Sequence, residues 1–222
     1  MHYDPPRERS PLPHAPFKAL TVPRPIGWLS SVSADGVENL APYSQWQNLT
    51  YDPPTVMFAA NRHSGGVVKD TVANAEATGW FVWNMATWDL REAVNISASQ
   101  FPAGVSEFDR AGLRRVLADL CPVPMVADSP FHYECKVLDI HHLPGNTPDT
   151  VVDVVYATVE RIHLDDRFLT PDGLVDIPRV RPIARMGYHT YAVVGETFEM
   201  RIPEGPDALH SGLEGTPIAE PA

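Results

Sequence analysis

Residues 27–41 read GWLSSVSADGVENLA, and this stretch decides the fold class. Two apolar runs, Gly27 to Ser33 and Val37 to Ala41, flank the segment that contains Asp35 and Gly36. An Asp-Gly pair between two such runs is a strong short-range signal for a β-hairpin. We therefore predict an antiparallel pair of strands here.

Further strand-like runs follow along the chain. Thr55 to Ala60 and Trp80 to Met85 are compact, β-branched or aromatic runs that suit strands buried on both faces. Phe131 to Ile140 and Val151 to Leu164 come later, and the second is long enough to bend along a barrel wall. The pattern predicts a mainly β fold, a closed or nearly closed β-barrel with peripheral helices, because closure removes exposed sheet edges.

Helix start signals interrupt the strands. The predicted helices are Asp70 to about Ala77, Trp88 to about Ala98, and a short one from Ser106. Asp70 and Thr87 are the candidate caps of the first two, and Gly79 lies just past the end of the first.

The 222 residues are enough for one sizeable domain, which we expect over residues 21–202. Residues 1–20 are predicted to form an extended arm, because prolines stand among charged residues there. Residues 203–222 are rich in Pro, Gly and Glu and are predicted to form a flexible tail. No apolar run approaches the roughly 18 residues that span a bilayer, and no secretory signal is evident, so a cytoplasmic location without membrane contact is expected.

Charge and cysteine content narrow the function classes. The formal net charge of −11 disfavours nucleic-acid binding, because no overall positive field gathers phosphate backbones. Cys121 and Cys135 do not form a close metal-ligand pair, and we interpret both as small buried residues.

One cluster of residues suits a phosphate group. Lys69, Asp70 and Thr71 stand at a predicted helix start, where unpaired backbone N–H groups favour an anion. The preceding loop, residues 61–66, adds Arg62 and two glycines that let the backbone fold closely around an anion. An exposed loop followed by a capped surface helix is the alternative interpretation.

A second cluster suits a planar ring with a polar edge. Tyr43, Ser44, Asn48 and Thr50 fall in a predicted connection between strands, where functional side chains are commonly displayed. Asn84 ends a strongly apolar strand, and its alternative role is to cap nearby backbone.

The ordered motifs of this chain resemble the flavin reductase-like, FMN-binding split-barrel family. The similarity covers about Thr21 to Arg201 and is most specific before Asn95. The motifs that carry it are Arg24-Pro25-Ile26 with Leu29-Ser30-Ser31, Asp35-Gly36, Asn39-Leu40-Ala41-Pro42-Tyr43-Ser44, Asp52-Pro53-Pro54, Lys69-Asp70-Thr71 and Phe81-Val82-Trp83-Asn84.

The resemblance implies a homodimer of split barrels that holds FMN near the subunit interface. It implies that Tyr43, Ser44, Asn48 and Thr50 approach the ring and ribityl chain. The residues that it implies beside the cofactor, around its phosphate or at the neighbouring strand end are Ala60, Asn61, Lys69, Asp70, Thr71 and Asn84. Arg185, Tyr188 and His189 belong to a late segment that could contact a nucleotide or substrate, or could instead be surface and core-edge residues. Trp46 and Trp80 depart from the family pattern, which leaves the shape of the pocket open.

Other chemistries find less support. His141 and His142 are adjacent in a predicted strand, so their side chains point to opposite faces, and we expect no metal site. His132, Glu134 and Lys136 alternate along a strand and are interpreted as a solvated face. Neither a Gly-x-Ser-x-Gly elbow nor a Gly-x-Gly-x-x-Gly fingerprint is found where a hydrolase or a separate nicotinamide-binding domain requires it.

Three functional hypotheses remain from the sequence. The first is an FMN oxidoreductase of the flavin reductase type, which takes hydride from NAD(P)H and passes electrons to oxygen or a partner monooxygenase. The second is a non-catalytic protein that stores or senses FMN. The third is a structural split barrel whose pocket is vacant or altered.

Overall fold

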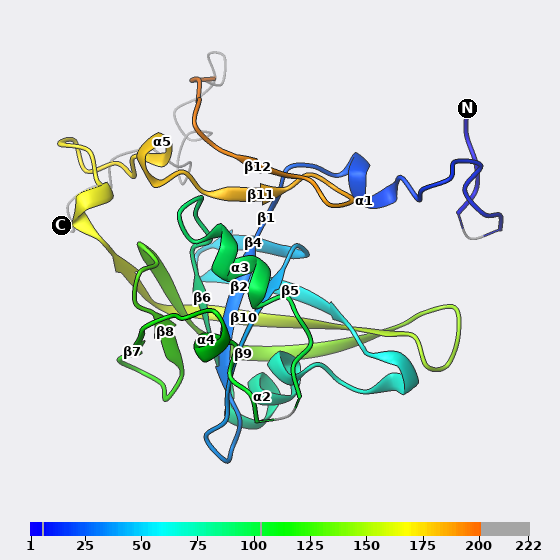
Figure 1. Ribbon diagram of the computed structural model, residues 1–222, viewed down its shortest axis with the longest axis horizontal. Helices are drawn as coiled ribbons and strands as arrows, with labels where there is room; N and C mark the ends of the chain where they lie inside the picture. Colours follow the sequence, from blue (N-terminus) through cyan, green and yellow to red (C-terminus); the bar gives the residue numbers. More distant parts are fainter. Residues whose placement is uncertain (6, 103, 201–222) are drawn as a thin grey trace.

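The computed structural model describes residues 1–5, 7–102 and 104–200, and its mainly β architecture confirms the predicted fold class (Figure 1). Seven strands pair antiparallel in the order β3-β2-β6-β9-β10-β5-β4. Their bounds are β2 Gly27–Val32, β3 Glu38–Tyr43, β4 Trp46–Tyr51, β5 Pro54–Asn61, β6 Trp80–Asn84, β9 Phe131–Pro144 and β10 Val151–Leu164.

Smaller elements surround this sheet. A three-stranded sheet has the order β1-β11-β12, and β7 pairs with β8. Their bounds are β1 Arg24–Pro25, β7 Arg115–Leu117, β8 Pro124–Val126, β11 Ile183–Arg185 and β12 Tyr191–Val193. The described helices are α1 Phe17–Leu20, α2 Asp70–Thr78, α3 Arg91–Ile96, α4 Glu107–Arg110 and α5 Ile177–Val180, with 3₁₀ turns at Ser64–Gly66 and Asp166–Phe168.

The predicted hairpin is confirmed as β2 and β3, and Gly36 in its turn has a φ of 83°. The two edge strands of the sheet, β3 and β4, are consecutive in the chain and are joined only by Ser44 and Gln45. The sheet must therefore curl to bring its two ends together. The backbone N–H of Ala59 on β5 donates to the carbonyl oxygen of Gln45 at 2.9 Å, which holds the connection near β5. β3 and β4 do not pair with each other, and we call the line between these two edge strands the seam of the split barrel.

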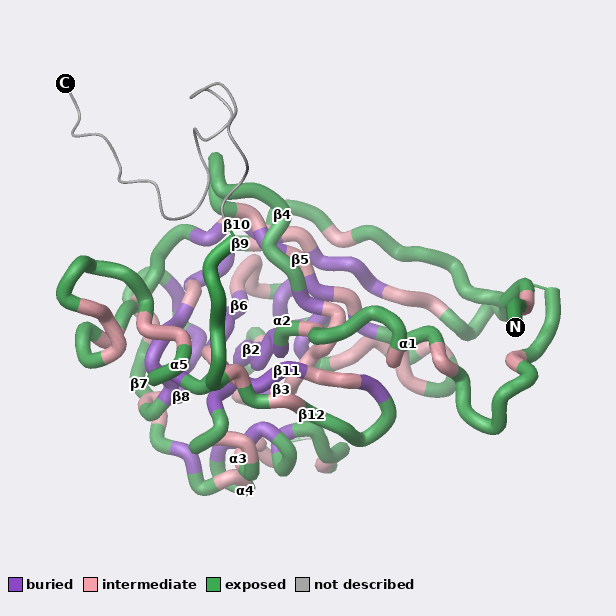
Figure 2. The backbone as a smooth tube through the Cα atoms, turned by 90° about the horizontal axis from the view of Figure 1, so that it is seen from above, coloured by how far each residue is buried: buried purple, intermediate pink, exposed green. Residues whose placement is uncertain are grey.

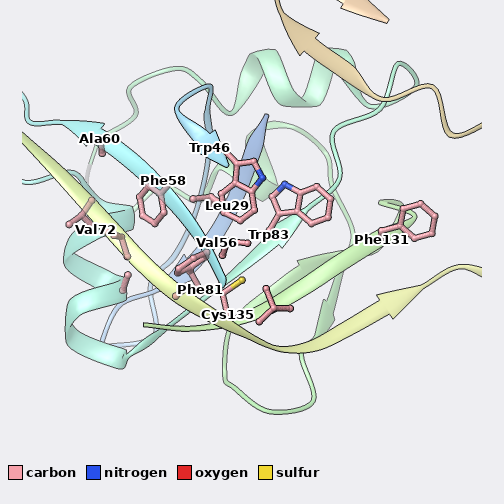
Figure 3. Close-up of a cluster of buried hydrophobic side chains, with 14 of the residues drawn as sticks. Leu29, Trp46, Val56, Phe58, Ala60, Val72, Phe81, Trp83, Phe131 and Cys135 are labelled. Atoms are coloured by element: carbon pink, nitrogen blue, oxygen red, sulfur yellow. The ribbon is translucent and has the colours of Figure 1, made fainter. Parts of the chain in front are cut away.

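Aromatic side chains fill the barrel core. The rings of Trp46 and Trp83 are parallel within 2°, with centroids 5.9 Å apart, and Figure 3 shows them side by side. Trp83 Nε1 donates to the carbonyl oxygen of Ile26 at 3.0 Å, so the polar atom of this buried ring is satisfied. A side chain at Gly27 would meet the Trp46 side chain at 2.9 Å, so this glycine makes room for the indole. Trp46 is therefore a core residue.

The structure corrects several predicted boundaries. Residues 46–51, expected as part of a connection, form the edge strand β4. The second helix, α3, begins at Arg91, because the backbone of Thr87 forms a bridge with Pro182 and that of Trp88 bonds to Arg181. In α2, the cap position is taken by Lys69 and not by Asp70.

The terminal predictions meet different outcomes. The short helix α1 falls within residues 1–20, and Figure 2 shows most of the described chain before it as exposed, so the extended arm stays a prediction. The predicted tail, residues 203–222, lies outside the described residues. No helix among the residues that the structure describes is long and apolar enough to cross a membrane. Cys121 and Cys135 are free and buried, as predicted, and burial raises the pKa of Cys121 to about 11.

The interpretation of His132, Glu134 and Lys136 as a solvated face is wrong for the first two, and only Lys136 is exposed. Glu134 is fully buried, and His132 is 7% exposed. The carboxylate of Glu134 accepts from the backbone N–H groups of Asp119 and Leu120, at 3.0 and 2.7 Å. His163 Nε2 lies 2.7 Å from the same carboxylate. The loop at residues 119–120, which lies 15 and 14 residues before Glu134 in the chain, therefore compensates the buried charge.

This cluster also brings together groups that could ligate a metal. Ligand atoms of Asp119, Glu134 and His163 lie within 4.8 Å of one another. Asp119 pairs with Arg161 at 2.7 Å, and Glu134 already has three hydrogen-bond partners. These contacts explain the cluster as an anchor for the loop that contains Asp119 and Leu120.

The Glu134 cluster predicts acid sensitivity. Burial alone would raise the pKa of Glu134, but His163 and the two backbone N–H groups outweigh it and lower the pKa below its ordinary value of 4.5. The stabilisation is complete above pH 4.5 and is lost as the pH falls through the lowered pKa of the folded state. We expect Glu134→Gln to be destabilised at pH 7 and the gap to the wild type to narrow toward pH 3.5, measured by urea unfolding. Glu160→Gln, at an exposed site on β10, is the control, and a gap independent of pH would contradict the assignment.

Candidate functional site

Two neighbouring cavities lie at the seam between β3 and β4. The larger has a volume of about 650 Å³, within the usual range for ligand sites, and the smaller about 180 Å³. Both are lined by Pro42, Tyr43, His63, Lys69 and Gln100, which form their shared wall. The larger cavity is also lined by Ser44, Gln45, Ala59, Ala60, Asn61, Arg62 and Ser64. The start of α2 and the Ser44 connection, predicted separately, thus meet at one site.

Lys69 presents a cation to the shared wall. Its Nζ lies 3.1 Å from His63 Nδ1. Because an ammonium can only donate, His63 Nδ1 is the acceptor of this hydrogen bond. Burial lowers the pKa of Lys69, with Asp70 acting in the opposite direction. The pair offers an ammonium together with an imidazole N–H donor.

Arg62 is held more firmly than the sequence predicts. Its guanidinium donates to both carboxylate oxygens of Asp153, at distances from 2.8 to 3.2 Å, and its Nη2 lies 3.3 Å from His142 Nδ1. Asp153 is fully buried; burial alone would raise its pKa, but Arg62 and His142 lower it. The chief partner of Arg62 is therefore a protein carboxylate, although the residue lines the larger cavity.

Thr71 and Tyr43 join α2 to β3 at the same place. The Tyr43 hydroxyl donates to Thr71 Oγ1 at 3.0 Å, and Asn39 Nδ2 donates to the same oxygen at 2.8 Å. Burial raises the pKa of Tyr43 to about 12, and the nearby Asp70 and Glu107 act in the same direction. The phenol is therefore protonated at neutral pH.

The two cavities differ in charge. Among the described residues that line the larger cavity, none is acidic, and Arg62, His63 and Lys69 are basic. The smaller cavity includes Asp70 and Glu107. Burial raises the pKa of Glu107, while the backbone N–H of Leu40, which donates to it at 3.0 Å, acts in the opposite direction. An anionic group is favoured at the shared wall, next to Lys69, and disfavoured next to Asp70 and Glu107.

Three residues predicted for the cofactor site do not line these cavities. Asn48 and Thr50 are exposed on β4. Asn84 is fully buried, and its Nδ2 donates to Trp28 O and Ser30 Oγ, both at 3.1 Å. Its Oδ1 accepts from Val126 N at 2.8 Å. Asn84 therefore joins three elements of the fold, which is the alternative role considered for it.

The late segment lies on the β11–β12 hairpin. Arg185 donates to the Tyr191 hydroxyl at 2.7 Å and to the Tyr188 carbonyl oxygen. His189 lines a separate cavity of about 330 Å³ beside α3. A nucleotide-binding role for Arg185, Tyr188 and His189 stays a prediction.

Sequence reasoning gave no role to several residues that line the site. These residues are Asn39, Gln45, Gln100 and Glu107. Asn39 has a usable signal, because it lies four residues before Tyr43, and an even spacing along a strand places both side chains on one face. Gln100 and Glu107 reach the site through the irregular chain after α3, which has no pattern that predicts its path.

The fold and the site together define a class: a split β-barrel protein whose cationic cavity suits a phosphorylated ligand. Residues 19–183 match the flavin reductase like domain family, and this chain belongs to that family. The uncharacterized protein BH2278 of Halalkalibacterium halodurans is 34% identical over 182 residues, which cover 82% of this chain and 87% of that protein.

Solved structures agree with the barrel. Nitrilotriacetate monooxygenase component B from Bacillus cereus is 28% identical, with a TM-score of 0.82 over 90% of this chain and 98% of that one. A split barrel domain protein from Shewanella frigidimarina is 19% identical, with a TM-score of 0.68 over 82% of this chain and 86% of that one. The family supports a flavin-related oxidoreductase role and a flavin cofactor.

Proposed function

We propose that the protein is an NAD(P)H-dependent FMN oxidoreductase that acts as a cytoplasmic homodimer. One observation carries the FMN assignment: Lys69 at the start of α2 and Ser44 at the barrel seam line the same cavity. FMN differs from riboflavin by a phosphate, and the ammonium of Lys69 with the donors around it supplies the compensation that a phosphate needs. The similarity to nitrilotriacetate monooxygenase component B supports transfer of electrons to oxygen or to a partner monooxygenase.

The residues of the cavity fit an FMN molecule by their chemistry. Lys69, His63 and Thr71 would hold the phosphate, and Tyr43 lies at the shared wall with its hydroxyl hydrogen-bonded to Thr71. Ser44, Gln45 and Asn61 would offer hydroxyl and amide groups to the polar edge of the ring, beside the small Ala59 and Ala60. A bound flavin would supply the two-electron chemistry, so these residues need only bind and orient it.

The second candidate, a protein that stores or senses FMN, shares the same binding site. The vacant-pocket alternative loses its basis, because Trp46 packs in the core and Trp80 lies near Lys136, with neither lining the cavities.

Anaerobic mixing with reduced nicotinamides separates these functions. We expect purified protein reconstituted with FMN to lose its absorbance near 450 nm when NADH or NADPH is added, and to regain it with oxygen. Stoichiometric yellow protein that neither nicotinamide bleaches would instead identify a storage or sensor protein. Protein that does not take up FMN at all would overturn both functions.

A further inference from the structure

The hydroxyl groups of Tyr43 and Thr71 carry one proton more than their mutual hydrogen bond uses. Only one proton can lie along the 3.0 Å line between the two oxygens. Tyr43 donates that proton, and Thr71 Oγ1 also accepts from Asn39 Nδ2 at 2.8 Å. With both lone pairs of Thr71 Oγ1 occupied, its own proton must point elsewhere.

Asn39 determines which hydrogen bonds the Thr71 hydroxyl can make. Its Nδ2 has two hydrogens, and they go to Thr71 Oγ1 at 2.8 Å and Ser31 Oγ at 3.3 Å. Asn74 Nδ2 donates to the same Ser31 oxygen at 3.1 Å. Asn39 and Asn74 are 9% and 8% exposed, and Ser31 and Thr71 are nearly inaccessible, so solvent does not compete with these bonds. The buried amides therefore fix the orientation of the Thr71 hydroxyl.

The surplus proton faces the cavities. Thr71 lines the smaller cavity, and Tyr43 lines both. No acceptor of the Thr71 proton is found among residues 1–5, 7–102 and 104–200. Lys69 and His63 also line the smaller cavity. A ligand in the smaller cavity thus meets the Thr71 hydroxyl donor and the Lys69 ammonium.

We propose that Asn39 is a positioning residue that turns the Thr71 hydroxyl proton toward the phosphate of a flavin nucleotide. The inference rests on the proposed function, and it assigns part of the preference for FMN over riboflavin to a buried amide that acts through the Thr71 hydroxyl. A purely structural role, in which Asn39 only pins α2 to the β2–β3 hairpin, would change the affinity for both flavins equally.

The test measures dissociation constants for FMN and riboflavin by fluorescence quenching and compares their ratio among variants. Thr71→Val removes the hydroxyl and keeps the shape, and we expect the preference for FMN to fall about tenfold, as for loss of a hydrogen bond to a charged group. Thr71→Ser keeps the hydroxyl and should restore most of the preference. Asn39→Asp presents a carboxylate that accepts the Thr71 proton, and the preference should again fall about tenfold.

A matched control separates this effect from added charge. Asn74→Asp introduces the same charge next to Ser31 but has no bond to Thr71, so the preference should change less than about threefold. Should Asn39→Asp not fold, Asn39→Ala removes the donor without adding charge, and a fall of about threefold is expected.

The outcomes are distinct. A wild-type preference for FMN that survives in both Thr71→Val and the Asn39 variants overturns the inference alone. Wild-type protein that binds neither flavin overturns the proposed function together with it. Equal weakening of FMN and riboflavin in the Asn39 variants assigns Asn39 a structural role and also overturns the inference.

Discussion

Replacing Lys69 by alanine is expected to weaken FMN binding by about ten- to a hundredfold and to change riboflavin binding little. Lys69 provides the ammonium at the shared wall of the two cavities, and a charge-assisted hydrogen bond contributes roughly 1.5–3 kcal/mol. Titration with both flavins checks the prediction, because only FMN carries the phosphate.

Two further variants sharpen this result. Lys69→Arg keeps the positive charge and should recover part of the FMN affinity. Lys136→Ala removes a lysine whose Nζ lies 6.0 Å from the Trp80 ring and that lines neither cavity, so both affinities should be unchanged. Equal losses for FMN and riboflavin in Lys69→Ala would show that the phosphate binds elsewhere.

Replacing Trp46 by alanine is expected to lower the free energy of unfolding by about 3–5 kcal/mol, the usual cost of removing a large buried aromatic side chain. The indole is 7% exposed, stacks on Trp83 and contacts Phe81 edge-on with ring centroids 6.4 Å apart. Urea unfolding measures the change.

The same strand provides the control for Trp46. Tyr51 on β4 is 69% exposed, so Tyr51→Ala should change the free energy of unfolding by about 0.5 kcal/mol or less. The folded fraction of Trp46→Ala should bind FMN with nearly wild-type affinity, because Trp46 does not line the cavities. A selective loss of FMN affinity with little loss of stability would place the indole at the ligand instead.

Elements with strong local signals could be predicted from the sequence. The bounds of β10 match the predicted Val151 to Leu164, because its apolar run is long and β-branched. In β4 only the first of six residues is buried, and its pairing with β5 shifts register between Asn48 and Thr50. An edge strand with polar, exposed side chains has no hydrophobic alternation that distinguishes it from a connection, so the sequence does not predict β4.

Features that depend on distant pairing could not be predicted. Glu134 is buried only because the backbone of residues 119 and 120 reaches its carboxylate, and its sequence neighbours give no sign of that. The residue types and spacing of Lys69 and Ser44 predict groups that could bind a phosphate and a ring. Their shared cavity depends on the curl of a seven-stranded sheet, which is a property of the whole fold.

The seam between β3 and β4 separates the chemistry of this protein from its framework. The ladder of hydrogen bonds runs through all seven strands, while the larger cavity is lined by the ends of β3 and β5, the connection after β3 and the loop before α2. Substitutions in residues 44–45 and 63–66 can therefore alter which molecule is recognised without breaking a rung of the ladder. Such an arrangement favours evolutionary diversification, because new specificities arise at the opening while the barrel is inherited intact.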